Sequence, residues 1–337
     1  GSRFLPEESS RARNQLSRIG ASGKAGTIQR AASPPRDLGR AARASGLQWL
    51  AGGGPRRIDE IPRTGSRVCE LLGLSCTAPV TLSLSLEALA RHGSATGAYR
   101  DGWGVAYYQY RDVRLIKDAA AAGSSDWIPF IQAHGLRSAL VMAHIRRAVR
   151  GRVAFENTQP FTRELGGRAH VFAHNGALDA AGLERLSTGR FRPMGESDSE
   201  LAFCHLLARL EPLWRSDDVP SLERRIEQLA EFSKAIRQLG PANFLYTDGE
   251  ALFAHSDRRL HADESVPRSP GLTLLERVCP AAVTAFDGVG VQLAAEGESR
   301  RVVLFASVPL SDERWEALVQ GTLVVAVAGR VVARIAS

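Results

Sequence analysis

The chain has 337 residues, 44% of them apolar and 23% charged, so it can bury a full core and hold one large domain or two small ones. Its formal charge of +7 is unevenly placed: residues 1–68 hold 13 basic and 5 acidic side chains (+8), leaving 30 and 31 (−1) for the rest. The basicity therefore belongs to the tail, and the near-neutral remainder argues against a fold built to bind a polyanion.

Residues 1–67 are rich in Arg, Ser, Gly, Ala and Pro and contain few large apolar side chains. Such a composition buries too little apolar surface to offset the entropy of ordering, so we expect disorder, with a short helix around residues 38–50. The segment 1–68 is interpreted as a propeptide, a targeting arm, codons upstream of the true start, or a piece added in cloning. Val68, directly before Cys69, fits the third explanation, because a GTG start codon is read as valine in a longer frame.

After residue 68 the pattern changes to short runs rich in Val, Leu and aromatic residues, bounded by Gly, Asp or Asn. These runs predict strands at 69–75, 103–110, 113–118, 138–145, 169–176, 242–248, 251–256, 301–307 and 321–335. Helical periodicity predicts helices at 82–91, 127–134, 199–210 and 220–238. Several strands precede the main helix pair, which favours a layered α+β domain over a regular βαβ alternation.

Four cysteines without a CxxC pair favour a reducing compartment and argue against a disulfide framework or a structural zinc site. No apolar run reaches the roughly 18 residues that span a bilayer, and no secretory signal core is visible. We therefore expect a cytoplasmic protein without membrane insertion.

Four short clusters carry residues that are able to do chemistry. Cys69 opens the first strand, Arg146 lies in AHIRRAVRG, Asn175 and Gly176 end FAHNG, and Asp198 lies in GESDSE at the head of a helix. Taken singly, each has a plain structural interpretation: a buried strand cysteine, a basic strand end, a turn and a helix N-cap. The lone histidines His144 and His174 are interpreted as structural, hydrogen-bonded groups, and Trp103 and Cys204 as core.

Taken together, the clusters describe a site for an amino acid. If Cys69 is the first residue of the working chain, its α-amine titrates near 7.7–8.0 and can act as the general base for the thiol. Asn175 and Gly176 can donate N–H groups to an oxyanion. Arg146 can hold a carboxylate, and Asp198 can pair with an ammonium group. This combination fits attack on the side-chain amide of glutamine.

The same residues carry a resemblance to the class II glutamine amidotransferases, whose nucleophile is an N-terminal cysteine. It covers residues 69–210 strongly and rests on six motifs in order: CELLGLS, DGWGVAYY, AHIRRAVRG, NTQPFTREL, FAHNG and GESDSELAFCHLL. The motifs are most similar to a compact bacterial subgroup that includes YafJ-like proteins and the γ-glutamyl amidohydrolase of ergothioneine synthesis. The resemblance implies an αββα sandwich of four layers, the N-terminal nucleophile hydrolase fold, formed by residues 69–337.

By this resemblance, Cys69 is the nucleophile and its α-amine the base, Asn175 and Gly176 form the oxyanion hole, and Arg146 and Asp198 bind the amino acid. Val149-Arg150-Gly151 departs from the Thr-His-Gly of the wider family, and Gln159 stands where histidine is common. With residues 1–68 attached, Cys69 has a peptide nitrogen in place of an amine. The mechanism therefore predicts that this segment is absent from the active enzyme.

The leading hypothesis is an enzyme that hydrolyses L-glutamine through a thioester, with no metal and no cofactor, and with any ammonia acceptor on another protein. A close alternative is an amidohydrolase for a larger γ-glutamyl compound. An alternative of another class is an inactive amidotransferase core that binds nucleic acid through its basic arm; the arm lacks interleaved aromatic residues, which argues against it.

Overall fold

The computed structural model describes residues 69–84, 101–146, 152–216, 218–261, 264–279, 284–286, 291–294 and 299–336. The chain divides into a unit of residues 1–61 and a unit of residues 62–337, and all described residues belong to the second. The predicted disordered tail and its short helix lie outside the described residues.

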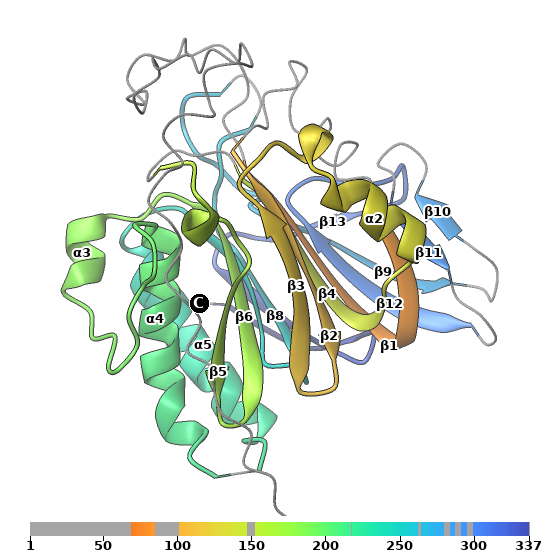
Figure 1. Ribbon diagram of the computed structural model, residues 1–337. Helices are drawn as coiled ribbons and strands as arrows, with labels where there is room; N and C mark the ends of the chain where they lie inside the picture. Colours follow the sequence, from red (N-terminus) through yellow and green to blue (C-terminus); the bar gives the residue numbers. More distant parts are fainter. Residues whose placement is uncertain are drawn as a thin grey trace, which may run out of the picture. The chain divides into compact units, whose positions relative to one another are not determined.

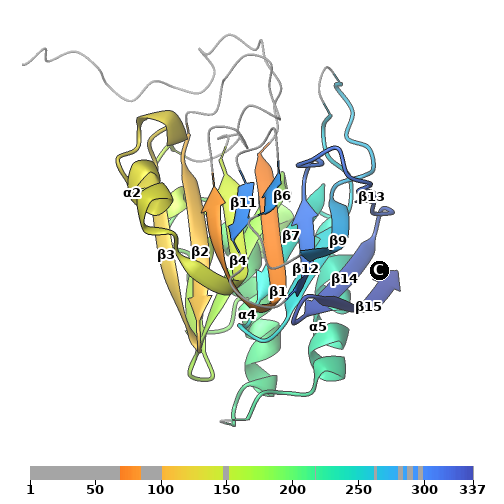
Figure 2. The same cartoon turned by 90° about the vertical axis from the view of Figure 1, so that its right-hand side faces the viewer.

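The first of two antiparallel sheets, sheet A, is built around the strand that begins directly after Cys69. This strand, β1 (Glu70–Leu84), lies between β4 and β12, as Figure 2 shows. The order is β13 (Glu316–Ala317), β9 (Thr273–Cys279), β12 (Arg300–Ala306), β1, β4 (Arg137–Ile145), β2 (Trp103–Gln109) and β3 (Asp112–Asp118). The far end of β1 also pairs with β11 (Val291–Ala294), which pairs with β10 (Thr284–Phe286). The first strand of the domain is thus held on both sides.

The second sheet, sheet B, packs face to face with sheet A (Figure 1). Its order is β15 (Arg330–Ala336), β14 (Thr322–Val327), β8 (Leu252–Ser256), β7 (Ala242–Thr247), β6 (Arg168–Gly176) and β5 (Phe161–Leu165). Alternation along each strand separates an inner from an outer face. Along β1, Leu71 enters the core between the sheets, whereas Leu72 and Leu74 enter the core on the outer face.

Helices cover the outer faces of both sheets (Figure 1). The helices α3 (Ala180–Glu184), α4 (Asp198–Leu210) and α5 (Leu222–Arg237) pack their apolar sides on sheet B, and α2 (Trp127–His134) packs on sheet A. Short 3₁₀ helices lie at Ala122–Ser124, Phe155–Asn157 and Glu211–Leu213. The predicted α+β sandwich with αββα layers is confirmed, and Trp103 and Cys204 are buried core residues as expected. No helix in the described part of the chain is long and apolar enough to cross a bilayer.

One predicted helix is wrong at its start. Residues 82–84, expected to begin a helix at 82–91, are the end of β1, and residues 85–91 lie outside the described residues. The stretch Val80–Leu84 alternates apolar and hydroxyl side chains, a period of two that fits a strand, and pairing with β4 and β11 extends β1 beyond residue 75. Five of the described strands were not predicted: β5 and β9, whose adjacent charged or polar side chains weaken the apolar pattern, and the short strands β10, β11 and β13.

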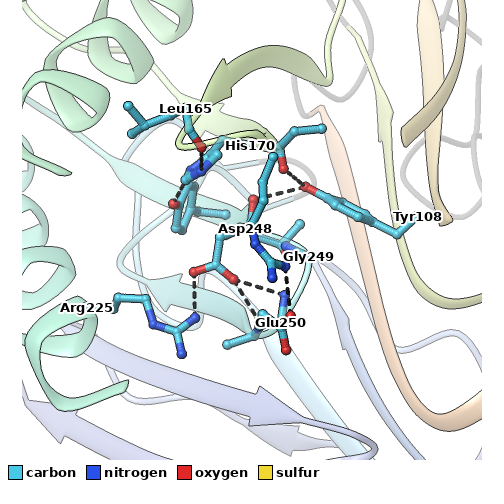
Figure 3. A network of polar contacts seen from close by, with 12 residues as sticks. Tyr108, Leu165, His170, Arg225, Asp248, Gly249 and Glu250 are labelled. Atoms are coloured by element: carbon cyan, nitrogen blue, oxygen red, sulfur yellow. Dashed lines mark hydrogen bonds and ion pairs between the residues drawn. The ribbon is translucent and has the colours of Figure 1, made fainter. Parts of the chain in front are cut away.

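A polar network joins α5, the turn between β7 and β8, and the start of β6 (Figure 3). Arg225 of α5 donates from Nη1 to Asp248 Oδ2 at 2.7 Å, and both side chains are buried. The other oxygen of Asp248 accepts the backbone N–H of Glu250 at 3.0 Å. Tyr108 of β2 donates to the carbonyl of Ala169 in β6 at 2.6 Å, which joins the two sheets. The network anchors α5 to the β7–β8 turn, at the end of the sandwich opposite to Cys69.

Candidate active site

Cys69 and Arg146 meet at one end of sheet A, on its inner face. In the β1–β4 register Glu70 pairs with Ile145, so the next position brings Cys69 opposite Arg146. The backbone N–H of Arg146 donates to Gly102 O at 2.8 Å, which extends the ladder to the start of β2. Leu71 faces sheet B, and by alternation Cys69, two residues earlier, faces the same way. The predicted nucleophile and the predicted carboxylate-binding residue therefore share one face.

Asn175 reaches this point from sheet B. It lies at the end of β6 opposite Asn243 of β7, and its side chain is 5% exposed. Its Nδ2 donates a short hydrogen bond to the backbone carbonyl of Cys69 and lies 3.5 Å from Ser307 Oγ. The predicted oxyanion-hole amide is thus in direct contact with the nucleophile residue across the gap between the sheets.

Gly176 comes after Asn175 at a place where only a hydrogen atom fits. A Cβ there would lie 1.8 Å from the carbonyl oxygen of Pro241 and 2.7 Å from His174 Nε2. A backbone carbonyl of the neighbouring chain segment cannot move aside as a flexible side chain can. The glycine at this position is therefore explained by close packing of the strand end, whatever part its N–H plays in chemistry.

The Arg146 side chain is buried, and one of its nitrogens donates to two backbone carbonyl groups. Its Nη1 donates to Arg152 O at 3.0 Å and to Asp101 O at 3.4 Å. Burial lowers the pKa of the guanidinium, and the nearby charges of Cys69, Asp101 and Asp198 act in the opposite direction. Arg146 is thus electrostatically coupled to both Cys69 and Asp198. The unusual Val149-Arg150-Gly151 segment lies outside the described residues.

Asp198 is the first residue of α4, directly after the N-cap Ser197. Its Oδ2 accepts the backbone N–H of Leu178 at 2.8 Å, and its Oδ1 accepts the N–H of Ser199 at 2.9 Å. The carboxylate therefore ties the loop after Asn175-Gly176 to the start of α4. All five residues predicted for the site are at this end of the sandwich.

His174 and Gln159 support the end of β6. Gln159 accepts the backbone N–H of His174 at 2.7 Å and donates to its carbonyl at 3.1 Å. His174 Nε2 donates to Pro241 O at 3.2 Å, and its Nδ1 accepts from Ser199 Oγ at 2.9 Å. Burial lowers the pKa of His174, and the charge of Asp198 acts in the opposite direction. The ring is hydrogen-bonded on both nitrogens, as predicted. Sequence reasoning noted Gln159 as a departure but missed its role as a clamp on the strand before Asn175.

His144 differs from this expectation. It is fully buried on the inner face of β4, next to Leu71 in the register, and neither ring nitrogen has a hydrogen-bond partner among the described residues. Burial, together with the charge of Arg146, lowers its pKa to about 3. The predicted hydrogen-bonded histidine is therefore wrong here: the ring is neutral and makes only packing contacts with its described neighbours.

Two loops beside the site are held by buried polar side chains that sequence reasoning did not select. Asn157 accepts the N–H of Glu196 at 2.8 Å and donates to Arg152 O at 3.1 Å. Glu200, fully buried on α4, accepts the N–H of Gly195 at 2.8 Å. The Arg152 carbonyl that holds Arg146 is thereby tied to the loop that leads into Asp198. The only signal in the sequence was that Asn157 lies in the motif NTQPFTREL and Glu200 in the motif GESDSELAFCHLL.

Glu70, the residue after Cys69, points to the opposite face of β1 and is fully buried. Neither carboxyl oxygen has a hydrogen-bond partner in the described part of the chain. Burial raises the pKa of this carboxyl from 4.5 to about 8, although the charge of Arg259 acts to lower it. Glu70 is therefore protonated at neutral pH.

This shift predicts how stability depends on pH. Between pH 4.5 and 8 the folded chain holds a proton on Glu70 that the unfolded chain releases, so stability falls as pH rises through this window. The slope from this group is about 1.4 kcal/mol per pH unit. Glu70→Gln, which mimics the protonated acid, should gain stability over the parent by about that amount from pH 6 to 7, measured by urea unfolding. If the stability of parent and variant changed with pH in parallel, the prediction would be contradicted. Glu227→Gln, at an exposed position, is the control and should follow the parent.

No group of three or more His, Cys, Asp or Glu side chains in the described ranges is arranged to hold a metal ion. The arrangement at this end is that of a thiol, a side-chain amide, a guanidinium and a carboxylate in one cluster. Its chemical capacity is nucleophilic attack on a carbonyl carbon, with N–H donors for the resulting oxyanion.

Comparison with known proteins agrees with this geometry. The family model for class-II glutamine amidotransferases matches residues 68–337. YafJ of Escherichia coli K12, named as a candidate glutamine amidotransferase, is 41% identical over 195 residues, covering 58% of this chain and 75% of YafJ. A Haemophilus influenzae protein named in the same way is 37% identical over 194 residues, covering 58% of this chain and 65% of its own length.

Solved structures show the same fold. A predicted glutamine amidotransferase from Pseudomonas aeruginosa has a TM-score of 0.59 and 33% identity, covering 79% of this chain and 100% of its own. The phosphoribosylpyrophosphate amidotransferase of Bacillus subtilis has a TM-score of 0.51 and 14% identity, over 80% of this chain and 49% of its own, which is a likeness of fold alone. With its family model matched from residue 68 to residue 337, the chain belongs to the class-II glutamine amidotransferases.

Proposed function

We propose that the chain hydrolyses the γ-amide of L-glutamine, or of a γ-glutamyl compound, at the thiol of Cys69. The observation that carries the proposal is the contact of the Asn175 side-chain amide with Cys69, with Arg146 opposite Cys69 in the register. An amide donor at the nucleophile serves an acyl-transfer reaction, because the negative charge develops on the substrate oxygen next to the attacking sulfur.

The proposed reaction has two halves. The Cys69 α-amine takes the thiol proton, and the thiolate attacks the amide carbon to give a tetrahedral oxyanion held by Asn175 and Gly176. The C–N bond breaks, the proton passes from the α-ammonium to the leaving nitrogen, and ammonia departs, leaving a γ-glutamyl thioester. Water, activated by the same amine, attacks the thioester and releases glutamate and the thiol.

Arg146 and Asp198 would hold the amino-acid end of the substrate. The guanidinium fork suits the α-carboxylate, and the Asp198 carboxylate suits the α-ammonium. The same contacts serve glutamine and a larger γ-glutamyl compound, because both share this end. A substrate of the ergothioneine subgroup would differ from glutamine only in the group attached beyond the γ-carbonyl.

The test is a side-by-side assay of a chain that begins at Cys69 with glutamine and with a γ-glutamyl peptide, reading glutamate release and trapping of the thioester by hydroxylamine. We expect turnover of at least one substrate, and none by Cys69→Ala. A faster γ-glutamyl peptide would identify the larger-substrate alternative. Failure of a correctly folded chain with both substrates would refute the proposal.

Arg146→Lys should weaken substrate binding with little effect on chemistry. Lysine keeps the charge but loses the planar fork that is held between the carbonyls of Arg152 and Asp101. We expect KM to rise about tenfold, with kcat within about threefold of the parent. Steady-state kinetics with glutamine measure both. An equal fall in kcat at unchanged KM would show that Arg146 acts on the reacting atoms and does not anchor the carboxylate.

A further inference from the structure

Ser307 lies at a junction of the nucleophile strand and the oxyanion amide. It is the residue directly after β12 and is 1% exposed. Its Oγ accepts the backbone N–H of Leu71 at 3.0 Å, and its own N–H donates to Leu71 O at 3.1 Å. Both backbone groups of the residue two positions after Cys69 are therefore fixed by one serine, which lies 236 residues away in the sequence.

The same oxygen also faces Asn175. The Asn175 Nδ2 lies 3.5 Å from Ser307 Oγ and donates its other hydrogen to the carbonyl of Cys69. A primary amide is planar and its two N–H bonds point in fixed directions, so an acceptor for one hydrogen fixes the aim of the other. When substrate binds, the hydrogen that points to the Cys69 carbonyl could be shared with a substrate oxygen beside it, without a turn of the amide, while Ser307 accepts the other hydrogen.

We propose that Ser307 is a positioning residue that aims the Asn175 amide at the reacting carbonyl while it holds the backbone of the nucleophile strand. The proposal rests on the proposed glutamine-hydrolysing function. Ser307 touches neither substrate nor thiol in this role, and it acts through Asn175 and Leu71. Because it belongs to sheet A and Asn175 to sheet B, it sets the distance between the two halves of the site.

Ser75 provides a matched control on the nucleophile strand. It is 2% exposed, and its Oγ accepts the N–H of Gly329 in the β14–β15 turn at 3.1 Å. Like Ser307 it joins sheet A to sheet B through a buried hydroxyl, but it is six residues away from Cys69 in the sequence. Ser75→Ala therefore measures the stability lost when such a hydroxyl bridge between the sheets is removed, without a change in the contacts of Asn175.

The kinetic test is a double-mutant cycle in the chain that begins at Cys69. Ser307→Ala should lower kcat for glutamine about tenfold at unchanged KM, which is the effect of one misaligned hydrogen bond. In an Asn175→Ala background the same change should lower kcat less than about twofold, because the amide that Ser307 aims is gone. Ser75→Ala should lose similar stability but keep its kcat. A tenfold loss in both backgrounds, or no loss in the first, would overturn the proposal.

A second measurement does not depend on activity. In ¹⁵N NMR spectra, hydrogen exchange of the Asn175 side-chain amide should speed up at least fivefold in Ser307→Ala, while the amide of Asn157, bonded to Arg152 O, stays unchanged. If the parent enzyme were inactive but exchange at Asn175 still became faster in Ser307→Ala, the proposed function would be rejected and the positioning role of Ser307 would stand. Unchanged exchange at Asn175 would reject the role of Ser307 whatever the activity.

Discussion

A chain that begins at Cys69 is expected to hydrolyse glutamine about 10²–10⁴ times faster than the chain that retains residues 1–68. The nitrogen of Cys69 is an amine in the first and a peptide nitrogen in the second, and a peptide nitrogen does not accept a proton at neutral pH. Neither histidine described near this end can replace the amine. Burial lowers the pKa of both rings, that of His144 to about 3, and His174 is hydrogen-bonded to Ser199 and Pro241 on the far side of β6 from Cys69.

The sharpest control is a chain extended by Val68 alone. It differs from the active form by one residue, which removes effects of the bulk of the longer segment. Glutamate release measures the rates, and alkylation of Cys69 by iodoacetamide as a function of pH measures the thiolate. The extended chain should lose the rate and show a higher thiol pKa. Full activity with Val68 attached would show that the α-amine is not the base.

The residues predicted for the site were those whose type alone suggests chemistry. A cysteine at a strand start, an arginine at a strand end, Asn-Gly after a strand and an aspartate at a helix start are visible in the sequence, and the structure places them at one end of the sandwich. Apolar runs also predicted most of the strands, because strands buried on both faces carry long apolar runs, whereas the four-layer αββα sandwich was implied by the family resemblance. The register that brings Cys69 opposite Arg146 could not be predicted from the sequence alone.

The residues that support the site were missed for a physical reason. Ser307 and Gln159 act through bonds to the backbone of other strands, and such bonds leave no local pattern. Glu70 was read as part of an apolar strand, although it is a carboxyl fully buried without a described hydrogen-bond partner. These roles depend on which strands become neighbours, and in a sheet with the order β9-β12-β1-β4 the neighbours are far apart in sequence.

The end of β6 that carries Asn175 is held by several hydrogen bonds, which is why we expect the Asn175 amide to contribute strongly to the transition state. Gln159 bonds both backbone groups of His174, and Asn243 of the neighbouring strand β7 donates to the carbonyl of Asn175 at 3.0 Å. A donor held in this way needs no rearrangement as charge develops, which is what makes an oxyanion hole effective. The amide should therefore contribute to the transition state far more than to substrate binding.

Asn175→Ala is accordingly expected to lower kcat by about 10²–10³ with KM nearly unchanged. Alkylation of Cys69 by iodoacetamide separates this effect from damage to the nucleophile, because displacement of iodide puts no new charge on a carbonyl oxygen. The alkylation rate should stay within about twofold of the parent. If it falls in step with kcat, the bond from Asn175 to the Cys69 carbonyl serves to hold the nucleophile strand, and the oxyanion must be held by another donor, of which the Gly176 N–H is the nearest along the chain.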